Sequence, residues 1–120
     1  MINIQERRKE IIEWHFPEDE KNPTIFHLKW LSGTREAYLR VTQAESGKPV
    51  SLDQWRKELL TNSIVKIENW ESENGKSVTL STPEQINKAC DLLSENEIYL
   101  LIAAIRREGK DYKLGLLEKN

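Results

Sequence analysis

The chain has 120 residues, 38% hydrophobic and 32% charged, and its 18 basic and 20 acidic residues leave a formal net charge of −2. This balance gives no overall electrostatic attraction to nucleic acid or to an anionic membrane. The length suits a single domain with a modest core, and the apolar residues are too numerous for a disordered chain. The single cysteine excludes an intrachain disulfide, so we expect a protein of a reducing cytoplasm.

Residues 1–10 are polar and weakly patterned, which predicts a flexible N-terminal segment without the features of a secretory signal. No apolar run approaches the roughly 18 residues needed to span a bilayer. Apolar and polar residues then alternate over 24–31, which predicts a half-buried strand. Together with the apolar segment 11–16, this strand predicts a β-hairpin closed by a polar loop.

Ser32, Gly33 and Thr34 form a turn and cap pattern that predicts a helix over about 34–44. Ser51 and Gln54 then have the spacing of a capping box. An apolar stripe follows over several turns and predicts a long helix over 52–70.

A rival interpretation ends this helix earlier and pairs a strand over 64–70 with a strand over 77–80. Asn74-Gly75 lies between them, and Asn-Gly is a strong hairpin turn. On the helical interpretation, 77–80 is instead a short edge strand beside the first hairpin.

Two further capping boxes predict the last two helices. Thr82 and Gln85, with Pro83 between them, start a helix that ends near Leu93. Ser94 and Glu97 start the next, which contains eight consecutive apolar residues over 98–105 and ends near Gly109.

A helix that is apolar on all sides must be covered on all sides. We expect one stripe of this helix to face the core, namely Ile98, Leu101, Ile102 and Ile105. The other stripe is a candidate partner-binding surface, namely Tyr99, Leu100, Ala103 and Ala104. Trp30 and Trp70 lie near the ends of their predicted elements, and such aromatic residues often anchor interfaces.

These elements predict an α+β fold dominated by helices, in which an N-terminal β-hairpin packs on a bundle of about four helices. We expect one globular domain over 11–109. Residues 110–120 form an amphipathic tail, broken by Gly115, that either docks on the core or orders only on a partner.

Catalytic and ligand-binding patterns are weak. His15 and His27 alone make a poor metal site, and Glu18-Asp19-Glu20 lacks the alternating ligands of a calcium loop. Gly75-Lys76-Ser77 ends like a phosphate loop without its first glycine, and Cys90 has no histidine nearby in the sequence. We therefore expect a binding protein with no enzymatic activity, cofactor or metal.

Three stretches carry a resemblance to a known class of proteins: Asn22–Gly33, Ile64–Trp70 and Asn74–Ile86. They resemble small morphogenesis proteins of long-tailed bacteriophages, commonly assigned as tail assembly chaperones. In those proteins an Asn-Pro-Thr strand leads to a helix, and a later Trp precedes an acidic Gly-Lys turn and a capped helix. This chain has Glu73 and Asn74 where Asp-Gly is more usual, and its tail has no counterpart.

The resemblance implies a protein of the host bacterial cytoplasm that binds other phage tail components, above all the tape-measure protein or the tail tube. It implies no catalytic residues. Self-association is compatible with it, and contact with nucleic acid or membrane is not expected. The alternatives are a structural component of the virion, at the neck or as a tail-completion protein, and a small host-directed enzyme or regulator.

Overall fold

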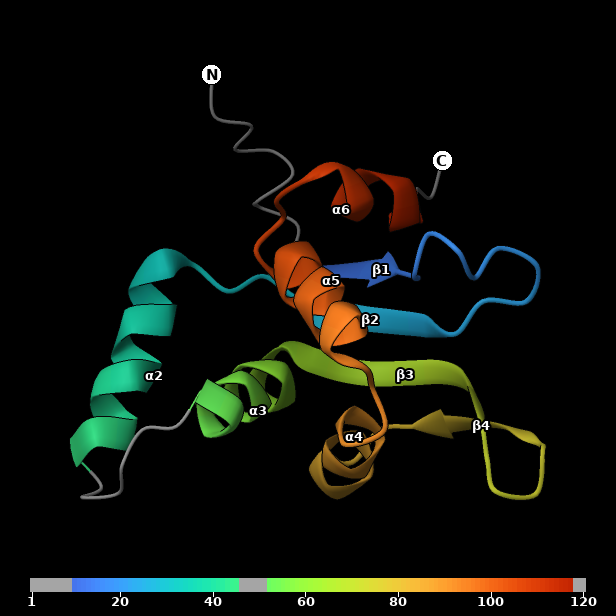
Figure 1. Ribbon diagram of the computed structural model, residues 1–120, viewed down its shortest axis with the longest axis horizontal. Coiled ribbons are helices and arrows are strands. Elements are labelled where there is room, and N and C mark those ends of the chain that lie inside the picture. The colour runs from blue at the N-terminus through green and yellow to red at the C-terminus, as the bar shows by residue number, and fades with distance from the viewer. Residues whose placement is uncertain (1–9, 46–51, 118–120) are drawn as a thin grey trace.

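The computed structural model describes residues 10–45 and 52–117 of the chain (Figure 1). Four antiparallel strands form one sheet in the order β1-β2-β3-β4. The strands are β1 (Ile11–Trp14), β2 (Ile25–Lys29), β3 (Ile64–Glu71) and β4 (Ser77–Leu80). The helices are α2 (Gly33–Glu45), α3 (Leu52–Ser63), α4 (Pro83–Cys90), α5 (Glu95–Ile105) and α6 (Lys110–Gly115).

The helices are not a bundle, so the predicted hairpin on four helices is wrong. The chain has an α+β fold in which α5 packs against β2 and α4 packs against β3. Figure 1 shows α2 standing away from the sheet and α6 lying beyond β1. The predicted first hairpin is present as β1 and β2, with Glu13 opposite His27, but it makes up only half of the sheet.

The long helix predicted over 52–70 is also wrong, and the rival interpretation is confirmed. Helix α3 ends at Ser63, and β3 begins at Ile64 and pairs with both β2 and β4. The error has a physical reason. Ile64 and Ile67 are buried three residues apart, a spacing typical of a helix, but here it arises from an irregularity in the pairing of β3 with β2.

Local capping signals predicted helix starts well. Thr82 and Gln85 form a reciprocal capping box at α4, and Ser94 and Glu97 form another at α5. The Ser32 side chain accepts a hydrogen bond from the Arg35 backbone N–H at the start of α2. The expected cap at Ser51 lies outside the described residues, as does the predicted flexible segment 1–10 except for Glu10.

The C-terminal segment docks on the sheet, which is one of the two alternatives that the sequence left open. Tyr112 of α6 is 1% exposed, and the Trp14 indole N–H donates to its carbonyl at 3.1 Å. The backbone N–H groups of His15 and Leu117 donate to Gly115 and Glu13 carbonyls, each at 2.9 Å. These bonds cover the outer edge of β1, an edge that would otherwise expose unpaired backbone groups.

Gly115 provides a test of this docking. A Cβ at this position would collide with the His15 carbonyl oxygen and would lie 2.5 Å from Trp14 Nε1. We expect Gly115→Ala to lower the free energy of unfolding by about 1–3 kcal/mol, as overpacking does, measured by urea denaturation. Gly33→Ala is the matched control because a Cβ there meets nothing within 4 Å. Equal stability of the two variants would contradict the docked arrangement.

Candidate functional site

Helix α5 divides its apolar residues between the core and the surface. Leu101, Ala104 and Ile105 are 0% exposed, so they form the core face. Ile98, Leu100, Ile102 and Ala103 are half-buried, and Tyr99 is 68% exposed. The predicted partner stripe is therefore split, and fully buried Ala104 offers no surface to another chain.

Leu100 lies instead in a surface groove that sequence analysis missed. The groove consists of two hollows of about 500 and 340 Å³ that share Phe16, Asp19 and Glu97. It runs between the β1–β2 loop and the first turns of α5, with Leu100 at one end and Trp70 at the other. Thus the structure brings two of the six predicted partner-binding residues to one site. We call it the acidic groove.

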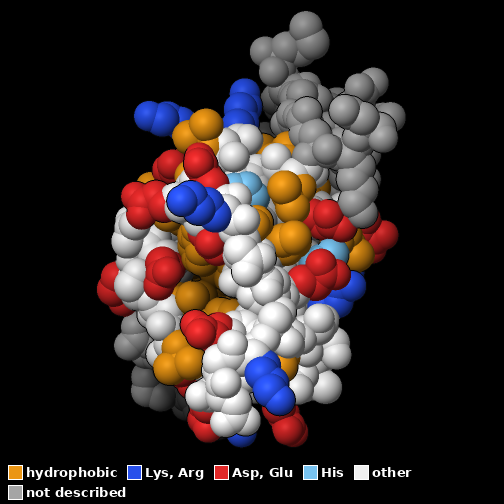
Figure 2. All heavy atoms as spheres, turned by 90° about the vertical axis from the view of Figure 1, so that its right-hand side faces the viewer, with side chains coloured by type: hydrophobic (Ala, Val, Ile, Leu, Met, Phe, Trp, Pro, Cys, Tyr) orange, Lys and Arg blue, Asp and Glu red, His pale blue; other side chains and the backbone are white. Residues whose placement is uncertain are grey.

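The floor of the acidic groove is apolar. Phe16 and Phe26 contact each other edge to face, with ring centroids 5.3 Å apart. Leu93 and Trp70 continue this apolar surface, and Leu92, which is 76% exposed, borders it. Figure 2 shows the hollow with its hydrophobic floor among acidic side chains, with a basic side chain at its upper edge.

The lining of the acidic groove contains five carboxylates and no lysine or arginine: Glu18, Asp19, Glu71, Glu97 and Asp111. Within the described residues, none of the five takes part in a salt bridge. Asp19 accepts a hydrogen bond from the Thr24 N–H at 2.9 Å, and Glu97 accepts one from the Ser94 N–H at 2.8 Å. The lining residues therefore carry negative charge that no salt bridge among the described residues neutralises.

Asn69 anchors the loop wall of the groove to β3. Its φ of 57° lies in the left-handed region, which asparagine tolerates better than most residues. Its side-chain amide donates to the carbonyls of Asn22 and Pro23 at 3.0 and 3.1 Å. The Thr24 hydroxyl donates to the Asn69 carbonyl at 2.9 Å. Residues from two of the stretches that carry the phage resemblance thus meet here.

We expect Asn69→Gly to loosen this wall, because glycine keeps the backbone conformation but removes the side-chain hydrogen bonds. A loss of about 1 kcal/mol, the net contribution of one hydrogen bond, predicts roughly fivefold faster amide exchange at Thr24, with Leu28 in the core unchanged. Hydrogen exchange read by NMR measures this. Asn74→Ala, in the exposed β3–β4 turn, is the control and should leave Thr24 exchange unaltered. Equal exchange at Thr24 in Asn69→Gly and the parent protein would contradict the anchoring role.

A second hollow, of about 500 Å³, lies between α3, α4 and the start of α5. Its charges are compensated: Arg56 pairs with Glu95 at 2.6 Å, and Lys57 pairs with Asp91 at 3.0 Å. Cys90 lines it but is 5% exposed, and burial raises the pKa of its thiol to about 11. A thiol with a raised pKa is a poor nucleophile at neutral pH.

The state of Cys90 can be tested directly. At pH 8 the raised pKa leaves little thiolate, so we expect the native protein to react with Ellman's reagent about a hundredfold more slowly than the guanidinium-unfolded chain. Absorbance of the released thionitrobenzoate measures the rate. A rapid stoichiometric reaction of the native protein would contradict the buried, protonated thiol and reopen a nucleophilic role.

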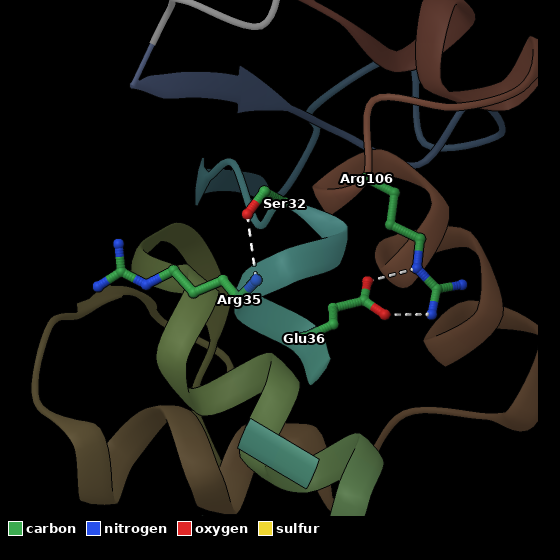
Figure 3. A network of polar contacts seen from close by, with 4 residues as sticks. All are labelled: Ser32, Arg35, Glu36 and Arg106. Atoms are coloured by element: carbon green, nitrogen blue, oxygen red, sulfur yellow. Dashed lines mark hydrogen bonds and ion pairs between the residues drawn. The ribbon is translucent and has the colours of Figure 1, made fainter. Parts of the chain in front are cut away.

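Trp30 lies apart from the acidic groove, in a hollow of about 390 Å³ beside Glu36 and Arg106. Figure 3 shows the Arg106 guanidinium from the end of α5 facing the Glu36 carboxylate on α2. Arg106 Nε and Nη2 donate hydrogen bonds to the two Glu36 carboxylate oxygens, at 2.6 and 2.9 Å. The hydrogen bond with Glu36 raises the pKa of Arg106, and burial of the guanidinium partly opposes this increase. This bidentate pair ties α2 to the body of the domain.

His27 lies on β2 between two carboxylates, with Nδ1 4.0 Å from Glu13 and Nε2 3.3 Å from Glu68. A hydrogen bond from Lys66 lowers the pKa of Glu68. Burial of the carboxyl group opposes this change, and the nearby His27 adds to it. Across residues 10–45 and 52–117, no group of three or more His, Cys, Asp or Glu side chains is arranged to hold a metal ion. The cluster joins β2 to both of its neighbouring strands, through Glu13 on β1 and Glu68 on β3.

No family model, curated protein or solved structure matches the chain. None of the described helices has the length and apolar character needed to span a bilayer.

The signals for the acidic groove are present in the sequence but scattered. Phe16 and Asp19 from the β1–β2 loop, Trp70 from β3 and Leu100 from α5 come from three segments that only the fold brings together. The run Glu18-Asp19-Glu20 is visible in the sequence, but on its own it suggested only a calcium loop, whose pattern it does not match.

Proposed function

We propose that this chain is a non-catalytic assembly factor of a long-tailed bacteriophage, which binds an apolar segment of another tail protein in the host cytoplasm and prevents its aggregation. The observation that carries the proposal is the acidic groove, whose apolar floor is open to solvent beside exposed Leu92. Exposed apolar surface rimmed by polar residues is typical of a protein-binding site.

The resemblance of Asn22–Gly33, Ile64–Trp70 and Asn74–Ile86 to tail assembly chaperones supports the choice of partner. The structure adds that Asn69 from one of these stretches is hydrogen-bonded to Asn22 and Pro23 from another, next to Thr24 and Trp70, which line the groove. A tape-measure protein is long and rich in apolar segments that are exposed before the tail is complete, so it is the partner most in need of cover.

The test is co-expression of the chain with a tape-measure protein of a long-tailed phage, with the soluble fraction of the tape measure as the readout. We expect solubility to depend on the chain and to fall with Leu92→Ser. Losing a buried leucine contact costs about 1.5–3 kcal/mol, or roughly a tenfold or greater loss of affinity. Leu114→Ser is the matched control, because Leu114 is 58% exposed but does not line the groove.

Equal solubility of the tape measure with and without the chain would contradict the proposal. Mass spectrometry of purified virions separates the assembly factor from the alternative of a neck or tail-completion component. A transient chaperone should be absent from the particle, whereas stoichiometric copies would show a structural role.

A further inference from the structure

We infer that the acidic groove binds a cationic amphipathic helix, one with an apolar stripe flanked on both sides by lysine or arginine. This inference rests on the proposed function and states the chemistry of the partner segment. The juxtaposition behind it is an apolar floor between two carboxylate-bearing walls.

The two walls carry their charges separately. Glu18 and Asp19 project from the β1–β2 loop and Glu71 from the end of β3. On the opposite side, Glu97 comes from α5 and Asp111 from α6. A helix whose apolar residues recur at three- and four-residue spacing places cations on both edges of its apolar stripe, which matches this arrangement.

The shape of the groove favours a polypeptide segment over a small ligand. The two hollows join at Phe16 and extend from Trp70 and Leu92 to Leu100 and Asp111. Apolar anchors at Trp70, Phe16 and Leu100 thus follow one another along the groove, as hydrophobic grooves for helices require.

Charge decides which helix is accepted. Unlike the hollow between α3 and α4, where Arg56 and Lys57 pair with Glu95 and Asp91, the acidic groove has no cation among its lining residues. An anionic partner would bring like charges together, whereas a cationic one gains attraction and a faster encounter. The attraction between exposed charges weakens as salt rises, since the screening length is about 10 Å at 0.1 M.

The experiment uses the full chain and fluorescein-labelled helical peptides, with binding read by fluorescence polarisation at low ionic strength. The probe has leucine at helical three- and four-residue spacing and lysine at the flanking positions. One comparison peptide replaces every lysine with glutamate, and another scrambles the leucine and lysine order. We expect the amphipathic lysine peptide to bind at least about tenfold more tightly than either comparison, with affinity falling as salt is raised.

Two matched double variants test the site. Glu18→Gln/Glu71→Gln removes two groove carboxylates, one on the β1–β2 loop and one at the end of β3. Glu58→Gln/Glu84→Gln makes the same change in net charge at exposed positions on α3 and α4. The groove variant should bind the lysine peptide about five- to tenfold more weakly, and the control variant should bind within about twofold of the parent protein. All three proteins should unfold at similar urea concentrations.

Three outcomes would overturn the inference: equal binding of the lysine and glutamate peptides, no binding of the lysine peptide, or equal weakening by the two double variants. Failure here is distinct from failure of the proposed function. If the chain keeps a tape-measure protein soluble but Glu18→Gln/Glu71→Gln does so equally well, the function stands and the charge preference is wrong. If the lysine peptide binds as expected but no tail protein is kept soluble, the groove chemistry stands and the phage role is wrong.

Discussion

Burial of one face of α5 against the sheet is the constraint from which the other surfaces follow. Leu101, Ala104 and Ile105 are fully enclosed, so the rotation of the helix about its axis is set. This rotation directs Glu97 and Leu100 toward the β1–β2 loop, where they line the acidic groove, and Ile98 toward α3. At the helix end it presents Arg106 to Glu36 on α2. A change in the core face would therefore alter three surfaces at once.

The distribution of charge separates structural surfaces from the candidate binding surface. Between α3, α4 and α5 the ions are paired within the chain, as they are between Glu36 and Arg106. The carboxylates that line the acidic groove form no salt bridge among the described residues, although the whole chain is nearly neutral. Net charge alone thus gave no hint of a charged site. Local accumulation of one sign over an apolar floor is what gives the groove a preference for its partner.

Local signals predicted the structure correctly, whereas a pattern that two structures share predicted it wrongly. The capping boxes at Thr82 and Ser94 were predicted from residues three apart, and both are present. The continuation of α3 beyond Ser63 was wrong because Ile64 and Ile67 have a spacing that suits either a helix or an irregular strand. Pairing with β2 decided between them, and that partner lies far away in the sequence.

The sequence by itself determined the starts of α2, α4 and α5, the first hairpin, the turn at Asn74-Gly75 as a rival interpretation, and the burial of Leu101 and Ile105. These depend on hydrogen bonds and periodicity within a few residues. Only the tertiary structure decided that Ala104 faces the core, that α6 covers the edge of β1, and that an acidic groove exists. The reason is that each of these results from contacts between segments distant in the chain, such as Asn69 with Pro23 and Trp14 with Tyr112.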